Sequence, residues 1–159
     1  MPYQYDHTMT ELVPTIDEIV KYGLQANIPA SDKEKLLEQH LIRIYALYFD
    51  IQYTFDETDF PAFDKSQPPD IRRNVESNFQ DFGLYKTHQD ILELDSLEDT
   101  SIGDAIDDLS DIITDLLEIK WRIEHHSWAD GLWFFVFIFK SHTQQHILDL
   151  LNYMKQKNG

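Results

Sequence analysis

The sequence predicts an all-α fold, an up-and-down helical bundle of four principal helices plus one or two short extra helices. Three observations support this. Long segments repeat apolar residues at helical spacing, and no long stretch alternates apolar and polar residues as a strand would. The chain also has 159 residues, of which 42% are hydrophobic, enough for one core without disulfides or metals. We therefore expect a single helical domain spanning 1–159.

The first two helices are predicted from apolar periodicity and start signals. In "TELVPTIDEIVKYGLQAN", residues 10–27, a threonine can cap the helix and Pro14 is expected within the first turn, where a missing N–H costs little. Ser31 and Glu34 have the spacing of a capping box, in which each side chain bonds a free backbone N–H. The second helix is expected to end near Thr54, with His40 in the middle of its apolar face.

The middle of the chain is predicted to contain an ordered loop and one short helix. Residues 55–69, "FDETDFPAFDKSQPP", mix prolines with acidic residues and with phenylalanines that can pack over a core edge. A short helix from about Pro69 to Phe79 follows. Residues 81–100 show no sustained period and are expected to be a long connection with at most one short turn of helix.

The C-terminal part predicts two long helices. One starts at Ser101, which can cap it with Asp104, and runs to about His126. On this helix Asp108 and Asp115 fall at the boundary of the apolar face, and Asp111 falls on the opposite side. After "SWADG" breaks the pattern, the last helix is expected to span 132–155. It is apolar nearly all round, which favours a central position or a homodimer.

Histidines and aspartates on these two helices form the candidate site. His142 and His146 lie four residues apart on one face and are predicted to point inward. One interpretation is that Asp108 and Asp115 accept hydrogen bonds from these buried imidazoles, which is favoured because buried polar groups need partners. The alternative is a divalent metal site formed by the same four residues, with His40 completing it if the second helix is adjacent.

Several catalytic signatures are absent from the sequence. It contains no Glu-x-x-His, no His-Glu-x-x-His, no Gly-x-Ser-x-Gly and no glycine-rich phosphate loop. His125 and His126 are sequential, so they should point to different faces, and a solvated helix end is expected there. The chain has no cysteine, which excludes disulfides, thiolate zinc sites and cysteine nucleophiles. A complete catalytic constellation is therefore not predicted.

Two motifs resemble the bacterial domain of unknown function 5063 family. The family has a D-x-x-DIY-x-DL helix followed by an aromatic helix with HWG-x-H. The first motif is matched at Asp108, Asp111, Asp115 and Leu116, and the second at His142 and His146; Thr143 and Gln144 depart from its Trp-Gly, and Phe82–Tyr85 resembles its upstream Gly-x-Tyr element. The resemblance covers about the last two thirds of the chain. It implies a small helical protein in which the two motifs pair, and it gives no reaction.

The charge bears on partners more than on fold. With 29 acidic and 13 basic residues the formal net charge is −16, which repels nucleic-acid phosphates and anionic membranes. No export signal or membrane-spanning segment is expected, so a cytoplasmic location is predicted.

We therefore predict a non-enzymatic interaction or regulatory module without a cofactor, acting as a homodimer or with a basic protein partner. One alternative is a metal-dependent, hydrolase-like enzyme with its Asp/His site between the last two long helices. Another is a nucleic-acid mimic that binds a basic protein.

Overall fold

The computed structural model describes residues 2–95 and 100–159 of a mainly helical protein with one small sheet. The elements, in chain order, are α1 (Pro2–Leu24), α2 (Lys33–Tyr48), α3 (Ile71–Asn78), β1 (Leu84–His88), β2 (Thr100–Asp104), α4 (Ala105–His125), α5 (Trp128–Ile138), the π-helical turn η1 (Phe139–Thr143) and α6 (Gln144–Asn158). The expected helical class is confirmed at this level. The up-and-down bundle arrangement stays a prediction.

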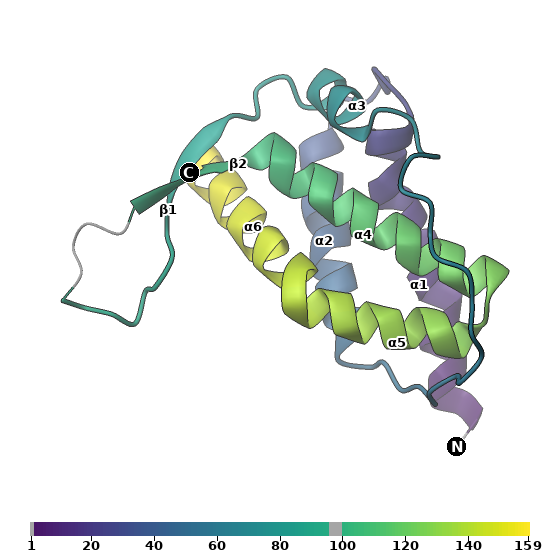
Figure 1. Ribbon diagram of the computed structural model, residues 1–159. Coiled ribbons are helices and arrows are strands. Elements are labelled where there is room, and N and C mark those ends of the chain that lie inside the picture. The colour runs from purple at the N-terminus through teal and green to yellow at the C-terminus, as the bar shows by residue number, and fades with distance from the viewer. Residues whose placement is uncertain (1, 96–99) are drawn as a thin grey trace.

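Helix α4 is central to the arrangement. It contacts α1, α3, α5 and α6, while α1 also contacts α2. Helix α5, the π turn and α6 follow one another without a loop and run alongside α4, with α1 and α2 behind them (Figure 1). A Cβ on Gly131 would lie 2.3 Å from Cγ1 of Ile123, so this glycine allows the start of α5 to approach α4 closely. The buried apolar residues form one cluster to which all of these helices contribute.

A β-hairpin replaces the expected long connection and the expected start of the acidic helix. Strands β1 and β2 pair antiparallel, from Leu84 opposite Asp104 to His88 opposite Thr100. Ser101 is therefore a strand residue and the predicted cap at this position was wrong. Helix α4 begins at Ala105, where the Asp104 side chain accepts a hydrogen bond from the Ile106 N–H at 3.0 Å.

Other predicted helix boundaries also need correction. Helix α1 begins upstream of the expected cap, so Pro14 lies inside it. The flanking residues Leu12 and Ile16 are fully buried, and this packing offsets one lost hydrogen bond. Helix α2 has Asp32 at its N-cap without a side-chain cap, and Glu34 instead binds Lys157 at 2.9 Å. Helix α2 also ends at Tyr48, before the predicted end.

The aromatic residues of the 55–69 loop pack as expected over the C-terminal part of α4 and over α5. The Phe55 ring contacts Trp133, and the Phe63 ring contacts Trp121. The Phe60 ring stacks on His126 with centroids 4.2 Å apart. None of the described helices is both long and apolar enough to cross a membrane.

Candidate metal site between α4 and α6

Three aspartates of α4 line the side that faces the C-terminal helical segments. Asp108, Asp111 and Asp115 follow the spacing i, i+3, i+7, which places them on one helical face. The side chains of Asp108 and Asp115 are 8% and 10% exposed, whereas Asp111 is 39% exposed. The face therefore has two buried carboxylates and one that reaches the surface between them.

The π turn brings two consecutive side chains to one of these carboxylates. His142 Nδ1 lies 2.7 Å from Oδ2 of Asp115, and the Thr143 hydroxyl donates to the same oxygen at 2.7 Å. A regular α-helix turns each residue by about 100°, so neighbouring side chains point to different faces. Single π turns of this kind are frequent at functional sites.

Each imidazole is oriented by one buried carboxylate. His146 Nδ1 lies 2.7 Å from Oδ1 of Asp108, which repeats the arrangement of His142 with Asp115. An ionised carboxylate only accepts hydrogen bonds, so each Nδ1 carries a proton and donates it. In the neutral tautomer, Nε2 then has a free lone pair, as a metal-binding histidine requires.

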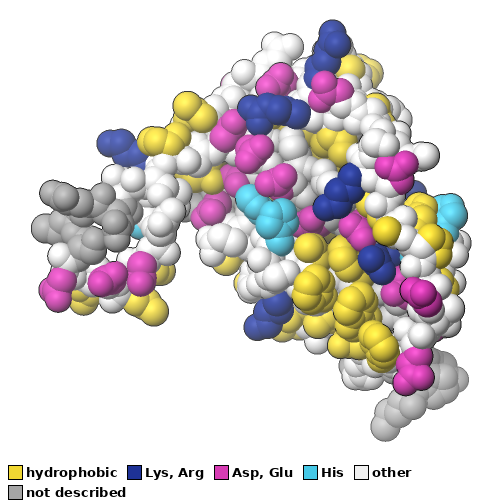
Figure 2. Space-filling model, in the orientation of Figure 1, with side chains coloured by type: hydrophobic (Ala, Val, Ile, Leu, Met, Phe, Trp, Pro, Cys, Tyr) yellow, Lys and Arg dark blue, Asp and Glu magenta, His cyan; other side chains and the backbone are white. Residues whose placement is uncertain are grey.

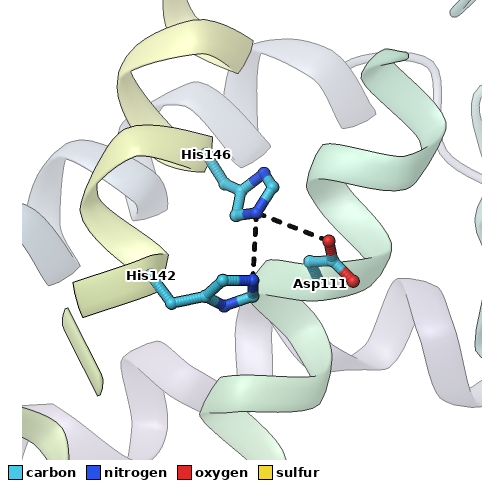
Figure 3. Close-up of side chains that lie close together, drawn as sticks. All are labelled: Asp111, His142 and His146. Atoms are coloured by element: carbon cyan, nitrogen blue, oxygen red, sulfur yellow. Dashed lines mark hydrogen bonds and ion pairs between the residues drawn. The ribbon is translucent and has the colours of Figure 1, made fainter. Parts of the chain in front are cut away.

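The two Nε2 atoms meet at the surface between α4 and α6. They lie 3.2 Å apart, and His146 Nε2 lies 3.4 Å from Oδ2 of Asp111 (Figure 3). One nitrogen from each histidine and one Asp111 oxygen all fall within 4.8 Å of one another. Figure 2 shows histidine side chains exposed over this junction, with acidic side chains gathered beside them. The three atoms thus converge where solvent has access.

Tyr85 of β1 extends this network to the hairpin. Its hydroxyl donates to Oδ2 of Asp108, the carboxylate that orients His146. Burial, together with this hydrogen bond, raises the pKa of Tyr85 far above its usual range, so the phenol stays protonated and remains a donor. A Cβ on Gly103 would lie 2.2 Å from the Tyr85 ring, so glycine is required for the ring to reach Asp108.

The electrostatics of the cluster favour bound positive charge. The hydrogen bond to Asp108 raises the pKa of His146, although burial acts in the opposite direction. Burial raises the pKa of Asp111, and the neighbouring histidines oppose this shift. A raised pKa at both residues means that the cluster favours an added proton. A metal ion would be favoured for the same reason, because it also adds positive charge.

The structure brings the four predicted site residues together and corrects their roles. Asp108 and Asp115 bind the Nδ1 atoms, as the favoured interpretation expects, and they do not face the Nε2 pair. The carboxylate beside Nε2 is Asp111, so its predicted place on the opposite side of the helix was wrong. Its spacing from Asp108 and Asp115 is the sequence signal that identifies it.

His40 does not join this group. Among the described residues, the converging cluster consists of Asp111, His142 and His146 only. His40 lies on α2, which contacts α6 only slightly, and its buried Nδ1 has no hydrogen-bond partner within the described part of the chain. The expectation that His40 completes a metal shell is therefore wrong.

Of the two histidines at the end of α4 that were predicted to be solvated, only one is exposed. His125 is exposed, but the His126 side chain is 2% exposed and its Nδ1 lies 2.7 Å from Asp130. Asp130 also binds Arg122 at 3.1 Å. The His126 Nε2 is buried and has no hydrogen-bond partner among the residues that the structure describes. The imidazole of this third pair packs between the ring of Phe60 and that of Trp121.

Comparison with protein-family models, curated proteins and solved structures finds no match to this chain. The resemblance of its two motifs to the domain of unknown function 5063 family stays a prediction.

Proposed function

We propose that the protein binds one divalent transition-metal ion through Nε2 of His142, Nε2 of His146 and a carboxylate oxygen of Asp111. Zinc and related ions bind imidazole nitrogens at about 2.0–2.1 Å, so two such ligands at a tetrahedral angle are about 3.3 Å apart. The separations of 3.2 Å between the two nitrogens and 3.4 Å from His146 to Asp111 match this value. Two of the three separations therefore suit one shared ion, and all three ligand atoms lie within 4.8 Å of one another.

The observation that carries the proposal is the close approach of the two Nε2 atoms. Each imidazole of His142 and His146 uses its Nδ1 proton on a buried carboxylate, so in the neutral rings each Nε2 carries a lone pair, and the two Nε2 atoms lie 3.2 Å apart. Two lone pairs at this distance repel unless a cation lies between them or one ring is protonated. Carboxylate–histidine pairs of this kind orient metal ligands and raise their basicity.

The donor set selects the class of metal. Imidazole nitrogens suit zinc, iron, nickel and copper, whereas calcium and magnesium take oxygen ligands. With neutral imidazoles, Asp108, Asp111 and Asp115 supply three negative charges, which exceed the two positive charges of the ion. The site therefore favours a retained cation over an anionic ligand.

A regulatory or structural use of the metal is better supported than catalysis. Zinc held by two histidines and one carboxylate can activate water, so these three ligands alone do not decide between the two uses. Here Asp111 is anionic and two further carboxylates bind the histidines, which makes ionisation of a bound water less favourable. We infer that the ion stabilises the contact between α4 and the π turn. This agrees with the predicted non-enzymatic module.

A hydrolase-like, metal-dependent enzyme is the second candidate. Three protein ligands leave at least one coordination position for water, and the His142 side chain is 42% exposed, so this position is accessible. The surrounding carboxylates favour a neutral or cationic substrate over a phosphate ester.

Metal analysis of tag-free protein tests the proposal. The purified chain should contain or take up about one equivalent of zinc, measured by elemental analysis and isothermal titration calorimetry. The His142→Ala, His146→Ala double variant and Asp111→Asn should lose this binding. His125→Ala and Asp59→Asn, which change exposed residues outside the site, serve as matched controls and should retain it. Folded wild-type protein that takes up no transition metal would contradict the proposal.

A further inference from the structure

The hairpin carries an unusual concentration of exposed apolar side chains. The hairpin arm, defined as residues 84–95 and 100–104, projects from the helical body (Figure 1). Its exposed apolar side chains, with their exposed fractions, are Leu84 (71%), Ile91 (76%), Leu92 (86%), Leu94 (85%) and Ile102 (68%). Such a concentration of exposed apolar side chains on one projecting element is a candidate interaction surface.

The base of the arm is fixed to the body. The Gly83 N–H donates to the Tyr153 hydroxyl at 2.9 Å, and the Ala105 N–H donates to the Gly83 carbonyl at 3.1 Å. The Tyr85 ring packs against Gly103 and reaches Asp108. The exposed leucines are therefore presented from an anchored base.

A cleft separates the arm from α6. Its volume is about 350 Å³, and it is lined by Thr87, His88, Gln89, Ile91, Ser101, Gln145 and Asp149. Ile91 supplies an apolar wall from the arm, and Asp149 supplies a carboxylate from α6. This cleft lies outside the cluster of Asp111, His142 and His146.

Asp149 gives the cleft an acidic side chain. Asp149 accepts a hydrogen bond from Gln145 at 2.9 Å, and no ion pair to it occurs among the residues that the structure describes. Burial raises the pKa of Asp149, and the nearby Asp108 carboxylate adds to this shift. None of the described lining residues is lysine or arginine, although His88 is among them. The arm carries the acidic side chains Asp90, Glu93 and Asp95 and one lysine, Lys86. A cationic group in the cleft would therefore meet more acidic than basic side chains.

We propose that the cleft between the hairpin arm and α6 is a docking site for a segment of another protein that combines aliphatic side chains with lysine or arginine. The aliphatic side chains pack against Ile91 and its neighbours on the arm, and a cationic side chain pairs with Asp149. A second copy of this chain fits less well, because its net charge of −16 would be brought against the same acidic surface. This docking site does not depend on metal binding.

Defined peptides and paired variants test the proposal. The full chain, kept in a chelator, is titrated with a short synthetic leucine–lysine peptide and with a serine–lysine peptide of equal charge, using fluorescence anisotropy. The leucine–lysine peptide should bind about tenfold more tightly, because only it buries aliphatic surface. Ile91→Ser and Asp149→Asn should each weaken its binding about fivefold or more. Ile42→Ser, which alters an aliphatic side chain 52% exposed on α2, and Asp59→Asn should leave it unchanged.

Each other outcome contradicts the proposal. Equal binding of the two peptides would show that charge alone attracts them. Unchanged affinity of Ile91→Ser and Asp149→Asn would place the binding elsewhere. Dimerisation of the wild type in sedimentation equilibrium, lost in Ile91→Ser and retained in Ile42→Ser, would make a second copy the occupant. Urea unfolding of each variant confirms that it is folded in these measurements.

Discussion

Imidazole–carboxylate pairs serve different ends in two regions, the N-terminal half of α4 and the junction of α4 and α5, which we call the C-terminal half. In both regions a histidine Nδ1 lies 2.7 Å from an aspartate oxygen, as His142 does from Asp115 and His126 from Asp130. The surroundings of the other ring nitrogen, Nε2, differ between the two regions. At the N-terminal half, Nε2 faces another Nε2 and a carboxylate at an accessible surface, whereas His126 Nε2 is buried without a hydrogen-bond partner among the described residues.

This difference shows what an oriented imidazole needs to become a ligand. The carboxylate fixes the ring and the tautomer in both places, and in that role it is structural. Only at the N-terminal half do several lone pairs converge where an ion can enter. Around His126 the ring of Phe60 stacks at 4.2 Å and the Arg122 guanidinium already neutralises Asp130. We therefore expect that changes to the His126–Asp130 pair alter the stability of the protein, and that changes to the His142–Asp115 pair alter metal binding.

The largest expected effect is on stability at the C-terminal half. His126→Ala removes a buried ring between two aromatic side chains, so the free energy of unfolding should fall by about 2–4 kcal/mol. His125→Ala changes the exposed neighbour and should alter it by less than about 0.5 kcal/mol. Urea unfolding followed by circular dichroism measures both, and equal losses would contradict the distinction between these residues. Zinc affinity should be unchanged in both variants.

The next effect concerns metal affinity at the N-terminal half. Asp115→Asn keeps the size of the side chain but removes the charge that orients His142, so zinc affinity should fall about 10–100-fold. Asp130→Asn makes the same change beside His126 and should leave zinc affinity unaltered, although it lowers stability. Calorimetric titration of the two variants gives the comparison. Equal affinities would show that the Asp115 carboxylate does not tune the ligand.

The helices could be predicted because apolar periodicity is a local signal. Leu109, Ile112 and Leu116 repeat at helical spacing, and all three are fully buried. The hairpin was missed because each strand has five residues and gains its hydrogen bonds only from a partner well separated in sequence. The absence of any alternating stretch was therefore a weak argument against strands.

The two histidines and the carboxylates that bind their Nδ1 atoms were predictable from the sequence, whereas the carboxylate beside Nε2 was not. Helical spacing pairs His142 with His146 and also relates Asp111 to Asp108 and Asp115, but Asp111 was predicted on the opposite side of the helix. The π turn that directs both His142 and Thr143 toward Asp115 follows from the packing of the C-terminal helices on α4, which no local pattern reveals. Burial of His126 depends on Phe60, which lies in a loop distant in sequence.

The smallest expected effect is a pH dependence that belongs to the N-terminal end of α4. Burial would raise the pKa of Asp104, but the hydrogen bonds from Arg72 at 2.8 Å and from the Ile106 N–H outweigh it and lower the pKa. A carboxyl whose folded pKa is depressed contributes stability above its unfolded pKa of about 3.9 and loses it as pH falls through the folded value. Asp104→Asn should keep the helix cap, because asparagine caps as well as aspartate, and should lose the charge pair.

Because Arg72 is 47% exposed, this loss at pH 7 should be below about 1 kcal/mol. The unfolded carboxyl pKa lies roughly one unit below pH 5 and roughly two units above pH 2. Between these two pH values, the stability of the variant should therefore fall less than that of the wild type. Urea unfolding across this range measures the difference, with Asp59→Asn as the control at an exposed carboxylate. Parallel pH profiles of wild type and Asp104→Asn would mean that the Arg72 pair does not stabilise the junction of hairpin and helix. The acid sensitivity would then have to come from other carboxylates.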